Sequence, residues 1–276
     1  MESHPQMIVF TDLDGCLLDA NTYAFEAAAP ALEALRTSRI PLILTSSKTR
    51  AEIEALRSQL NHSEPFIAEN GGGLFIPKGF FPFPLEGSAL RGPYQVVEFG
   101  IPYARLRSAL KEIEQAVGYV FRGFGDMPPE EVAARTGLSY AEAVLAKQRQ
   151  YDEPFVIEGP PARIEGVQHE IEARGLRCTR GGRFYHLMGD SDKGAACRYL
   201  IQCYRRQHGE LLTVAIGDSL NDLTMLAAVD RPFLVKQPDG SYEEEIRLPK
   251  LVRVSGAGPV GWSEAVLEML KDGQRG

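Results

Sequence analysis

The first informative feature of the chain is a short apolar run, Met7–Phe10, which is followed at once by two aspartates, Asp12 and Asp14. An apolar run of this length that ends in charge predicts a buried parallel strand whose carboxyl end opens on a crevice, where ligands of open α/β sheets bind. Burying carboxylates is costly unless a cation or hydrogen-bond donors compensate them. The pair therefore predicts a metal ion at this edge, and the alternative is a solvated turn that caps a helix.

Composition and charge restrict the class of protein. The 276 residues fit one large domain or two smaller ones, and a formal net charge of −7 without a long basic block argues against nucleic acid as the main partner. No run of ~18 apolar residues and no signal peptide are visible, so we expect a protein that crosses no membrane and stays in the cytoplasm. The four cysteines form no CxxC pair, which predicts reduced thiols rather than disulfides or a zinc site.

Strand-like apolar runs alternate with helical patterns in the first and last thirds of the chain. This alternation predicts βαβ units and a doubly wound, mostly parallel sheet, an α/β core of the Rossmann-like class. A capping box of Thr49 and Glu52 predicts the start of one core helix. The expected strands cover residues 7–10, 40–44, 66–68, 211–216, 233–235 and 251–254, with a short antiparallel return at 73–76. The expected helices cover 27–37, a segment after residue 49, 193–207, 221–228 and 259–270.

The middle of the chain has a different character. Prolines and glycines punctuate it from about residue 80, and helical patterns are mixed with strand candidates. The helical patterns cover 103–116, 139–150 and 162–174, and the strand candidates cover 95–99, 155–158, 176–179 and 183–187. That mixture predicts a separate α+β domain, inserted into the core because the core pattern resumes afterwards. We expect core residues at 1–82, an inserted α+β cap domain at 83–188 and further core residues at 189–276.

Polar residues follow three of the predicted core strands, and a lysine opens the helix that precedes the third of these strands. In chain order, these residues are Asp12, Asp14, Thr45, Ser46, Lys193, Asp218, Asn221 and Asp222. Their order, and their places at strand and helix ends, resemble the four motifs of the haloacid dehalogenase-like phosphohydrolases. The resemblance implies a Rossmann-like core with a cap, and hydrolysis of a phosphate monoester.

The resemblance also implies a role for each catalytic residue. Asp12 would attack phosphorus and carry it as an aspartyl phosphate, and Asp14 would protonate the leaving alcohol and then deprotonate the attacking water. Dehalogenases lack this second acid, so Asp14 implies a phosphatase or a mutase. Thr45 would donate a hydrogen bond to the phosphoryl group, and Lys193 would offset its charge. The structural alternatives are a helix cap for Thr45 and an exposed helix position for Lys193.

The same resemblance implies Mg²⁺ as the cofactor. The expected ligands are the carboxylates of Asp12 and Asp218 and the main-chain carbonyl of Asp14, completed by water or substrate oxygens. Asn221 and Asp222 are expected to hold these ligands in place without contacting the ion themselves. A position at a helix N-terminus, favoured by the helix dipole, is compatible with that role for Asp222.

The position of the insertion separates the branches of this family. The stretch from Asp12 to Thr45 is too short for an extra domain, whereas the stretch from Thr45 to Lys193 is long enough. This resembles the branch whose α+β cap follows the second motif and whose members largely hydrolyse sugar phosphates. Segments 44–49, 69–72 and 147–155 further resemble the mannosyl-3-phosphoglycerate phosphatases. Many relatives in the branch carry Thr-Gly-Arg after the second strand, and this chain departs from them with Thr-Ser-Ser.

A substrate of that family presents a phosphate, a glycerate carboxylate and the hydroxyls of a mannosyl ring. Cap residues should therefore offer cations and hydrogen-bonding groups. The substrate-binding candidates are Ser46, Asn70 and Gly71 in the core, and Lys147, Arg149, Glu153, Arg183 and His186 in the cap. Each has a structural alternative, since exposed Lys and Arg are usually only solvated, His186 suits a core position and Asn70 suits a turn.

Other functions remain open at this point. A phosphatase of another sugar phosphate uses the same core residues, and a phosphomutase uses the same two aspartates but retains a sugar bisphosphate intermediate. A non-catalytic binding protein on this scaffold is disfavoured because every catalytic position of the motifs is occupied. The expected partner is a small phosphorylated molecule, and the oligomeric state is left open.

Overall fold

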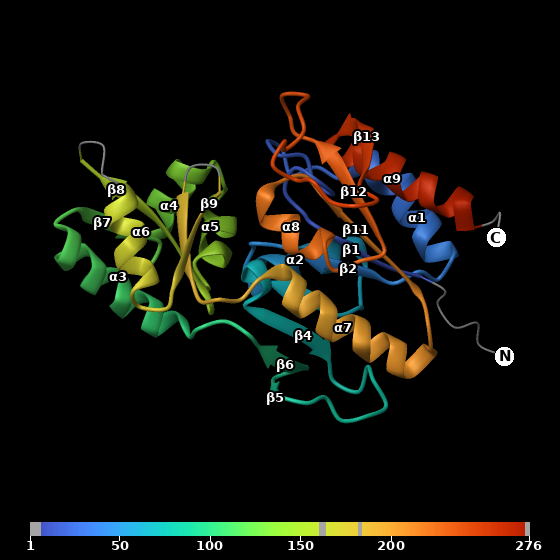
Figure 1. Ribbon diagram of the computed structural model, residues 1–276, viewed down its shortest axis with the longest axis horizontal. Coiled ribbons are helices and arrows are strands. Elements are labelled where there is room, and N and C mark those ends of the chain that lie inside the picture. The colour runs from blue at the N-terminus through green and yellow to red at the C-terminus, as the bar shows by residue number, and fades with distance from the viewer. Residues whose placement is uncertain (1–6, 160–163, 182–183, 274–276) are drawn as a thin grey trace.

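A nine-stranded sheet organises the larger part of the computed structural model, which describes residues 7–159, 164–181 and 184–273 (Figure 1). The strand order is β13-β12-β11-β1-β2-β3-β4-β6-β5, parallel from β13 to β3 and antiparallel from β4 onward. The strands are β1 (Met7–Thr11), β2 (Leu42–Thr45), β3 (Phe66–Ala68), β4 (Gly73–Pro77), β5 (Ser88–Arg91), β6 (Tyr94–Glu98), β11 (Leu212–Gly217), β12 (Arg231–Lys236) and β13 (Val252–Ala257).

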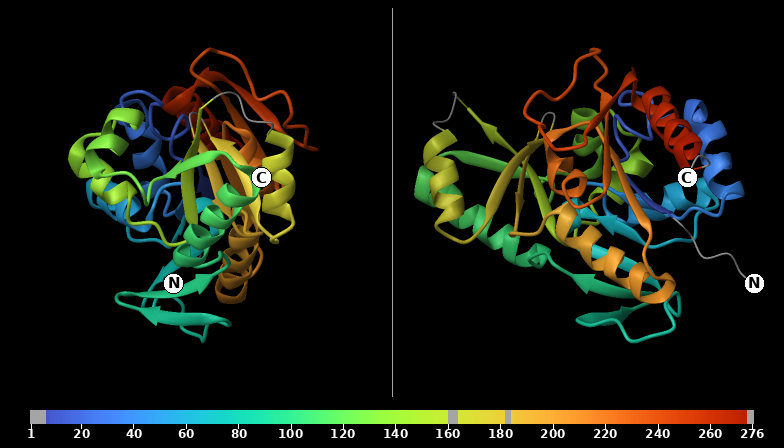
Figure 2. Two further views of the ribbon diagram at one scale, coloured as in Figure 1. Left: turned by 90° about the vertical axis from the view of Figure 1, so that its left-hand side faces the viewer. Right: turned by 45° about the vertical axis from the view of Figure 1, so that its right-hand side comes forward.

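Helices cover both faces of this sheet, as predicted for a doubly wound α/β core (Figure 2). Val9 of β1 packs in the cluster that contains α1, α2 and α9, while Ile8 and Phe10 pack in the cluster that contains α7 and α8. Because both faces of β1 are covered, its sequence is continuously apolar rather than alternating. These helices are α1 (Ala29–Thr37), α2 (Arg50–Leu60), α7 (Lys193–His208), α8 (Leu223–Leu226) and α9 (Gly258–Gly273), with short 3₁₀ turns η1 (Glu26–Ala28), η2 (Glu69–Gly71) and η3 (Leu220–Asp222).

A second, antiparallel sheet of order β7-β8-β10-β9 forms the smaller part, on the left of Figure 1. Helices α3 and α6 pack on one face of it, and α4 and α5 pack on the other. The elements are α3 (Tyr103–Val117), β7 (Val120–Gly123), α4 (Pro129–Thr136), α5 (Tyr140–Ala146), β8 (Asp152–Glu158), α6 (Ile164–Glu172), β9 (Arg177–Gly181) and β10 (Phe184–Met188). We call residues 103–188 the cap and the nine-stranded unit the core.

The expected start of the inserted unit at residue 83 does not match the sheet. Strands β5 and β6 lie beyond that point, yet β6 pairs with the core strand β4 and β5 pairs with β6, so the chain leaves the core sheet only after β6. The change of composition near residue 80 marks a loop of the core. Its Phe80 and Phe81 rings pack edge-on against Tyr204 of α7, which explains why apolar residues occur in a proline-rich stretch.

Several expected elements differ in extent. The helix predicted at 139–150 ends at Ala146, and α4 and β7 were not predicted. Pro129 lies in the first turn of α4, where proline is tolerated, so the Pro128–Pro129 pair opens a helix instead of only breaking one. The helix predicted at 221–228 is the short pair η3 and α8, and that predicted at 162–174 is α6, with residues 160–163 outside the described part. Within the described part, no helix combines the length and apolarity that a bilayer crossing requires.

Candidate active site

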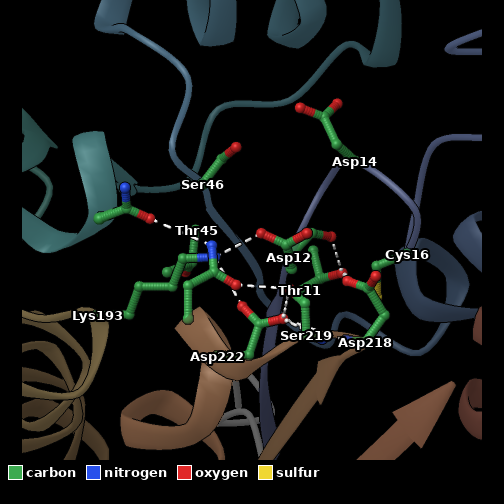
Figure 3. A network of polar contacts seen from close by, with 12 residues as sticks. Thr11, Asp12, Asp14, Cys16, Thr45, Ser46, Lys193, Asp218, Ser219 and Asp222 are labelled. Carbon is green, nitrogen blue, oxygen red and sulfur yellow. Dashed lines mark hydrogen bonds and ion pairs between the residues drawn. The ribbon is translucent and has the colours of Figure 1, made fainter. Parts of the chain in front are cut away.

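The catalytic candidates meet at the carboxyl edge of three adjacent parallel strands. Thr11 of β1 lies in register with Leu44 of β2 and Ile216 of β11, so the residues that follow these strands gather at one edge. Asp12 lies there, buried, with its Oδ1 atom 2.5 Å from the Nζ atom of Lys193 (Figure 3). The structure therefore brings together residues that are far apart in the sequence.

Lys193 is fully buried at the first position of α7 and is shared between two carboxylates. Its Nζ atom also donates to Asp222 Oδ1 at 2.7 Å. Burial lowers the pKa of Lys193, but Asp12 and Asp222 raise it more, so the side chain stays a cation. The exposed helix position that was the alternative for Lys193 is excluded by this burial.

Asp12, Asp218 and Asp222 form a cluster in which one oxygen of each lies within 4.8 Å of the others. Burial raises the pKa of Asp12 to about 7, with Asp222 adding to the rise and Lys193 opposing it. Burial and the Asp12 carboxylate likewise raise the pKa of Asp218 well above its usual range. Three buried carboxylates with a single lysine among them lack positive charge, which is the electrostatic environment of a divalent cation site.

A buried carboxylate oxygen without a hydrogen-bond partner also indicates a cation site here. The Oδ1 atom of Asp218 is buried and has no hydrogen-bond partner among the described residues. By contrast, Asp222 Oδ2 accepts bonds from the backbone N–H groups of Asp218 and Ser219, at 3.1 and 3.2 Å. Asp222 thus holds the turn that presents Asp218, while Asp218 keeps an oxygen free for a hard cation such as Mg²⁺.

Asp14 faces away from this cluster. Figure 3 shows its carboxylate turned from Asp12, and its Oδ2 atom lies 2.9 Å from Lys48 Nζ. Its other oxygen is buried and has no hydrogen-bond partner in the part of the chain that the structure describes. An unpaired carboxylate oxygen beside the reacting edge suits a group that exchanges protons.

Thr45 is the last residue of β2, Ser46 follows it, and both are buried beside this cluster (Figure 3). The Thr45 hydroxyl donates to the Ile43 carbonyl at 3.4 Å, and the Ser46 hydroxyl accepts from the N–H of Lys48 at 3.1 Å. Their expected contacts with a phosphoryl group remain predictions. The next two residues, Ser47 and Lys48, line the cavity described below.

A cavity of about 670 Å³ opens above these residues, between the core and the cap. Its volume lies within the range of about 300–1,000 Å³ that is usual for small-molecule sites. Its polar lining includes Asp12, Asp14, Lys48, Asn70 and Asp218 from the core, and Arg149 and His186 from the cap. The catalytic candidates are thus reached through a chamber whose walls come from both units.

The expected cap contacts divide into two groups. Arg149 and His186 line the cavity, as expected for substrate-binding residues. Lys147 and Glu153 do not: the Lys147 ammonium donates to two backbone carbonyls in the 124–127 loop, and Glu153 accepts from Arg107 at 2.6 Å inside the cap. Both are charged groups whose burial is compensated by structural partners, so substrate binding by them is not supported. Arg183 lies outside the described residues.

Asn70 and Gly71 have different roles. Asn70 lines the cavity, and its Oδ1 atom accepts a bond from Asn221 Nδ2 at 3.3 Å. Gly71 has a φ of +91°, and a Cβ atom there would lie 2.2 Å from the Asp192 carbonyl oxygen. Close packing against the start of α7 therefore explains the glycine, and the expected substrate contact of Gly71 is not what requires it.

Contacts between the core and the cap were not predicted from the sequence. The buried carboxylate of Glu69 accepts from the N–H groups of Gln150 and Tyr151, and Arg149 Nη1 donates to the Ser47 carbonyl at 2.8 Å. Burial raises the pKa of Glu69 to about 7, although Arg149 lowers it. These contacts involve segment 147–155, in which the sequence indicates a family motif but not a junction between core and cap.

Comparison with known proteins places the chain among phosphatases. A model of the haloacid dehalogenase-like hydrolase family matches residues 9–78. The chain is 48% identical to the glucosyl-3-phosphoglycerate/mannosyl-3-phosphoglycerate phosphatase of Methanococcoides burtonii, over 95% of this chain and 97% of that protein. It is 38% identical to the protein of the same name from Persephonella marina, over 98% and 99%. A solved sugar phosphatase of subclass IIB of this superfamily shares the fold, with a TM-score of 0.64, 16% identity and coverage of 95% and 98%.

Proposed function

Because this chain belongs to the haloacid dehalogenase-like hydrolases, in the family of the glucosyl-3-phosphoglycerate/mannosyl-3-phosphoglycerate phosphatases, we propose that it hydrolyses mannosyl-3-phosphoglycerate to mannosylglycerate and inorganic phosphate. The names of the relatives add the glucosyl compound as a second substrate. The two compounds share the phosphate and the glycerate and differ in the sugar. The enzyme class is that of the phosphoric monoester hydrolases.

The observation that carries this proposal is the buried pair of Asp12 and Lys193, in which Asp12 lines a cavity shared by core and cap. A nucleophile held beside a cation suits attack on a phosphoryl group, because the negative charge that gathers on its oxygens is offset in place. The chamber above is large enough for a phosphorylated glycoside.

In the proposed first step, a carboxylate oxygen of Asp12 attacks phosphorus, and the bond from phosphorus to the glycerate oxygen breaks. Asp14 gives its proton to that oxygen, which leaves as an alcohol. In the second step Asp14 takes a proton from water and the water oxygen attacks phosphorus. The bond from phosphorus to the Asp12 oxygen breaks, which restores the Asp12 carboxylate and releases inorganic phosphate. Lys193 and the Thr45 hydroxyl stabilise the phosphoryl oxygens through both steps.

We propose Mg²⁺ as the cofactor, held by the carboxylates of Asp12 and Asp218 and by the main-chain carbonyl of Asp14. The support is the shortage of positive charge in the cluster and the unpartnered oxygen of Asp218. Carboxylate and carbonyl oxygens are the ligands that Mg²⁺ prefers. When bound, the ion supplies charge neutralisation at the phosphoryl group.

Substrate recognition is proposed to fall to Asn70 in the core and to Arg149 and His186 in the cap, which all line the cavity. His186 is oriented by Asp152, whose Oδ2 atom lies 2.8 Å from His186 Nδ1, so the opposite ring nitrogen stays available. We further propose a cytoplasmic location, which the free state of all four cysteines supports.

A phosphate-release assay tests this function. Purified enzyme should release phosphate from mannosyl-3-phosphoglycerate and from the glucosyl compound far faster than from mannose 6-phosphate or glucose 6-phosphate. The activity should require Mg²⁺ and disappear in excess chelator. If the enzyme hydrolysed hexose phosphates as fast as the glycosyl phosphoglycerates, the proposed substrate would be wrong and only the assignment as a phosphatase would stand.

A further inference from the structure

Lys48 is a cavity-lining cation in direct contact with the expected general acid. Its Nζ atom lies 2.9 Å from Asp14 Oδ2 and 3.9 Å from Glu52 Oε1, and it stands 4.5 Å above the centre of the Tyr23 ring. Burial lowers the pKa of Lys48, but Asp14 and Glu52 raise it more, so the group is positively charged. The mechanism above gives this residue no task.

The position of Lys48 is fixed by the element that follows it. Thr49 and Glu52 form the capping box of α2: Glu52 Oε2 accepts from the Thr49 N–H at 2.8 Å, and Thr49 Oγ1 accepts from the Glu52 N–H at 3.2 Å. The lysine therefore enters the cavity from a rigid helix start, and its side chain is only 13% exposed. A charge held this way is suited to recognising one group of a substrate.

Asp14 cannot keep this contact during the reaction. Its carboxylate points away from Asp12, whereas a general acid must come within hydrogen-bond distance of the oxygen that leaves phosphorus. When Asp14 turns toward Asp12, Lys48 loses its nearest negative partner. The ammonium, which is only 13% exposed, then keeps the more distant Glu52 carboxylate at 3.9 Å, so a second anion is favoured in the place that Asp14 leaves.

We propose that Lys48 binds the carboxylate of the substrate's glycerate group, which takes the place of Asp14 beside the ammonium. The inference rests on the proposed function. It identifies the residue that recognises the glycerate carboxylate, which both glycosyl phosphoglycerates have. In these substrates only a short carbon chain separates the leaving oxygen from the carboxylate. A cation that contacts the general acid therefore lies where the carboxylate must be when the leaving oxygen reaches Asp14.

The other cations near the cavity are less suited to this task. Lys147 is held by backbone carbonyls of the cap. Arg149 donates to the carbonyls of Ala146 and Ser47 and lies 3.6 Å from Asp152. Arg180 also lines the cavity, but it is exposed and its guanidinium lies 5.5 Å above the centre of the Tyr185 ring. None of these three cations is paired with Asp14, the group that must move during the reaction. The core therefore recognises the glycerate, and the cap binds the sugar.

The test compares two substrates that differ in one group: mannosyl-3-phosphoglycerate and its carboxamide, in which a neutral amide replaces the carboxylate. The wild-type enzyme should prefer the carboxylate, in kcat/KM, by about 10- to 100-fold, the usual contribution of a hydrogen bond to a charged group. In Lys48→Met this preference should fall to within about threefold. Lys48→Arg should retain most of the preference, because the Met and Arg side chains are both unbranched but only Arg is positively charged.

Lys111→Met is the matched control. Lys111 is also paired with two carboxylates, Glu114 at 3.0 Å and Asp126 at 3.6 Å, but it lies in the cap away from the cavity lining. This variant should keep the wild-type preference. Circular dichroism and thermal unfolding of Lys48→Met should match the wild-type protein, which confirms its fold.

The outcomes separate this inference from the proposed function. A preference that survives in Lys48→Met, or equal losses on both substrates in that variant, would contradict carboxylate binding by Lys48. Equal rates for the two substrates in the wild-type enzyme would overturn it too while leaving the phosphatase function intact. Failure of the wild-type enzyme to hydrolyse either compound would overturn the proposed function itself.

Discussion

At the scale of single residues, the partners of each buried charge indicate what it does. Lys147 and Glu153 have structural partners in the cap, and Lys193 is shared by Asp12 and Asp222. Among the described residues, buried carboxylate oxygens without a hydrogen-bond partner belong to Asp14 and Asp218 at the catalytic edge and to Asp152 beside His186. Since buried polar atoms are rarely left unsatisfied, those in a cavity mark groups that await a ligand or a proton.

The first prediction concerns Asp14. Asp14→Asn keeps the shape of the side chain but cannot donate a proton as a carboxylic acid does, so kcat for mannosyl-3-phosphoglycerate should fall by ~10²-fold or more. Substrate should still bind, which isothermal titration calorimetry can measure. Hydrolysis of the aspartyl phosphate slows for any substrate, because Asp14 is also the base of the second step, so the diagnostic quantity is the rate at which the leaving group is released in the first turnover. For p-nitrophenyl phosphate this rate should fall much less than for mannosyl-3-phosphoglycerate, because its leaving group needs little help from an acid. Equal losses of the first-turnover rate on both substrates would argue against a proton donor.

The second prediction concerns Asp218. Asp218→Ala removes a carboxylate from the cluster without disturbing a packed apolar side chain, so the fold should persist while Mg²⁺-dependent activity is lost. Calorimetric titration with Mg²⁺ should show weakened binding in the variant. Wild-type Mg²⁺ affinity in Asp218→Ala would rule out the ligand set given above.

At the scale of elements, the sequence predicts well where an element is buried on both sides. β1, β2 and β11 have continuous apolar runs because helices cover both faces of the sheet, and the polar residues that follow them therefore signal the site. Elements with one exposed side were missed or misplaced. β5 is a partly exposed edge strand, and α4 has a single buried residue, Val132, so neither has a strong apolar pattern.

The third prediction concerns the junction of η2 with α7. In Gly71→Ala the new methyl group would meet the Asp192 carbonyl at 2.2 Å, so η2 and the start of α7 must move apart. Because Lys193 follows Asp192, activity should fall at least tenfold. Gly79→Ala is the control: Gly79 has a similar φ of +78° but nothing within 4 Å, so it carries only the backbone strain. Matching activity in the two variants would refute the close-packing explanation.

The fourth prediction concerns Glu69, which holds the joint between core and cap. Its pKa is raised from about 4.5 to about 7 in the folded protein, so the stability it contributes is present below pH 4.5 and is lost as the pH rises to 7. Glu69→Gln cannot titrate. Between pH 4.5 and 8 the free energy of unfolding should therefore shift in favour of the variant by up to about 3 kcal/mol. Chemical denaturation at several pH values measures this, and a pH-independent difference would contradict it.

At the scale of the whole molecule, the cavity is formed by residues that no local pattern relates. His186 lines it, whereas its neighbour Leu187 packs in the cap interior, and this choice depends on the register of β10 against β8. Sequence patterns predicted the core motifs because each lies directly after a core strand or, for Lys193, at the start of a core helix. They could not predict which cap residues face the core, since that requires the packing of the two units against each other.

The proposed mechanism requires that Asp12 carries the phosphoryl group during turnover. Enzyme mixed with mannosyl-3-phosphoglycerate and Mg²⁺, stopped rapidly with acid and digested, should yield a phosphorylated peptide that mass spectrometry assigns to Asp12. Asp14→Asn should yield the same peptide, and Asp12→Asn should yield none and should have no phosphatase activity. Rapid phosphate release by Asp12→Asn, or a phosphoryl group on any other residue, would rule out Asp12 as the nucleophile.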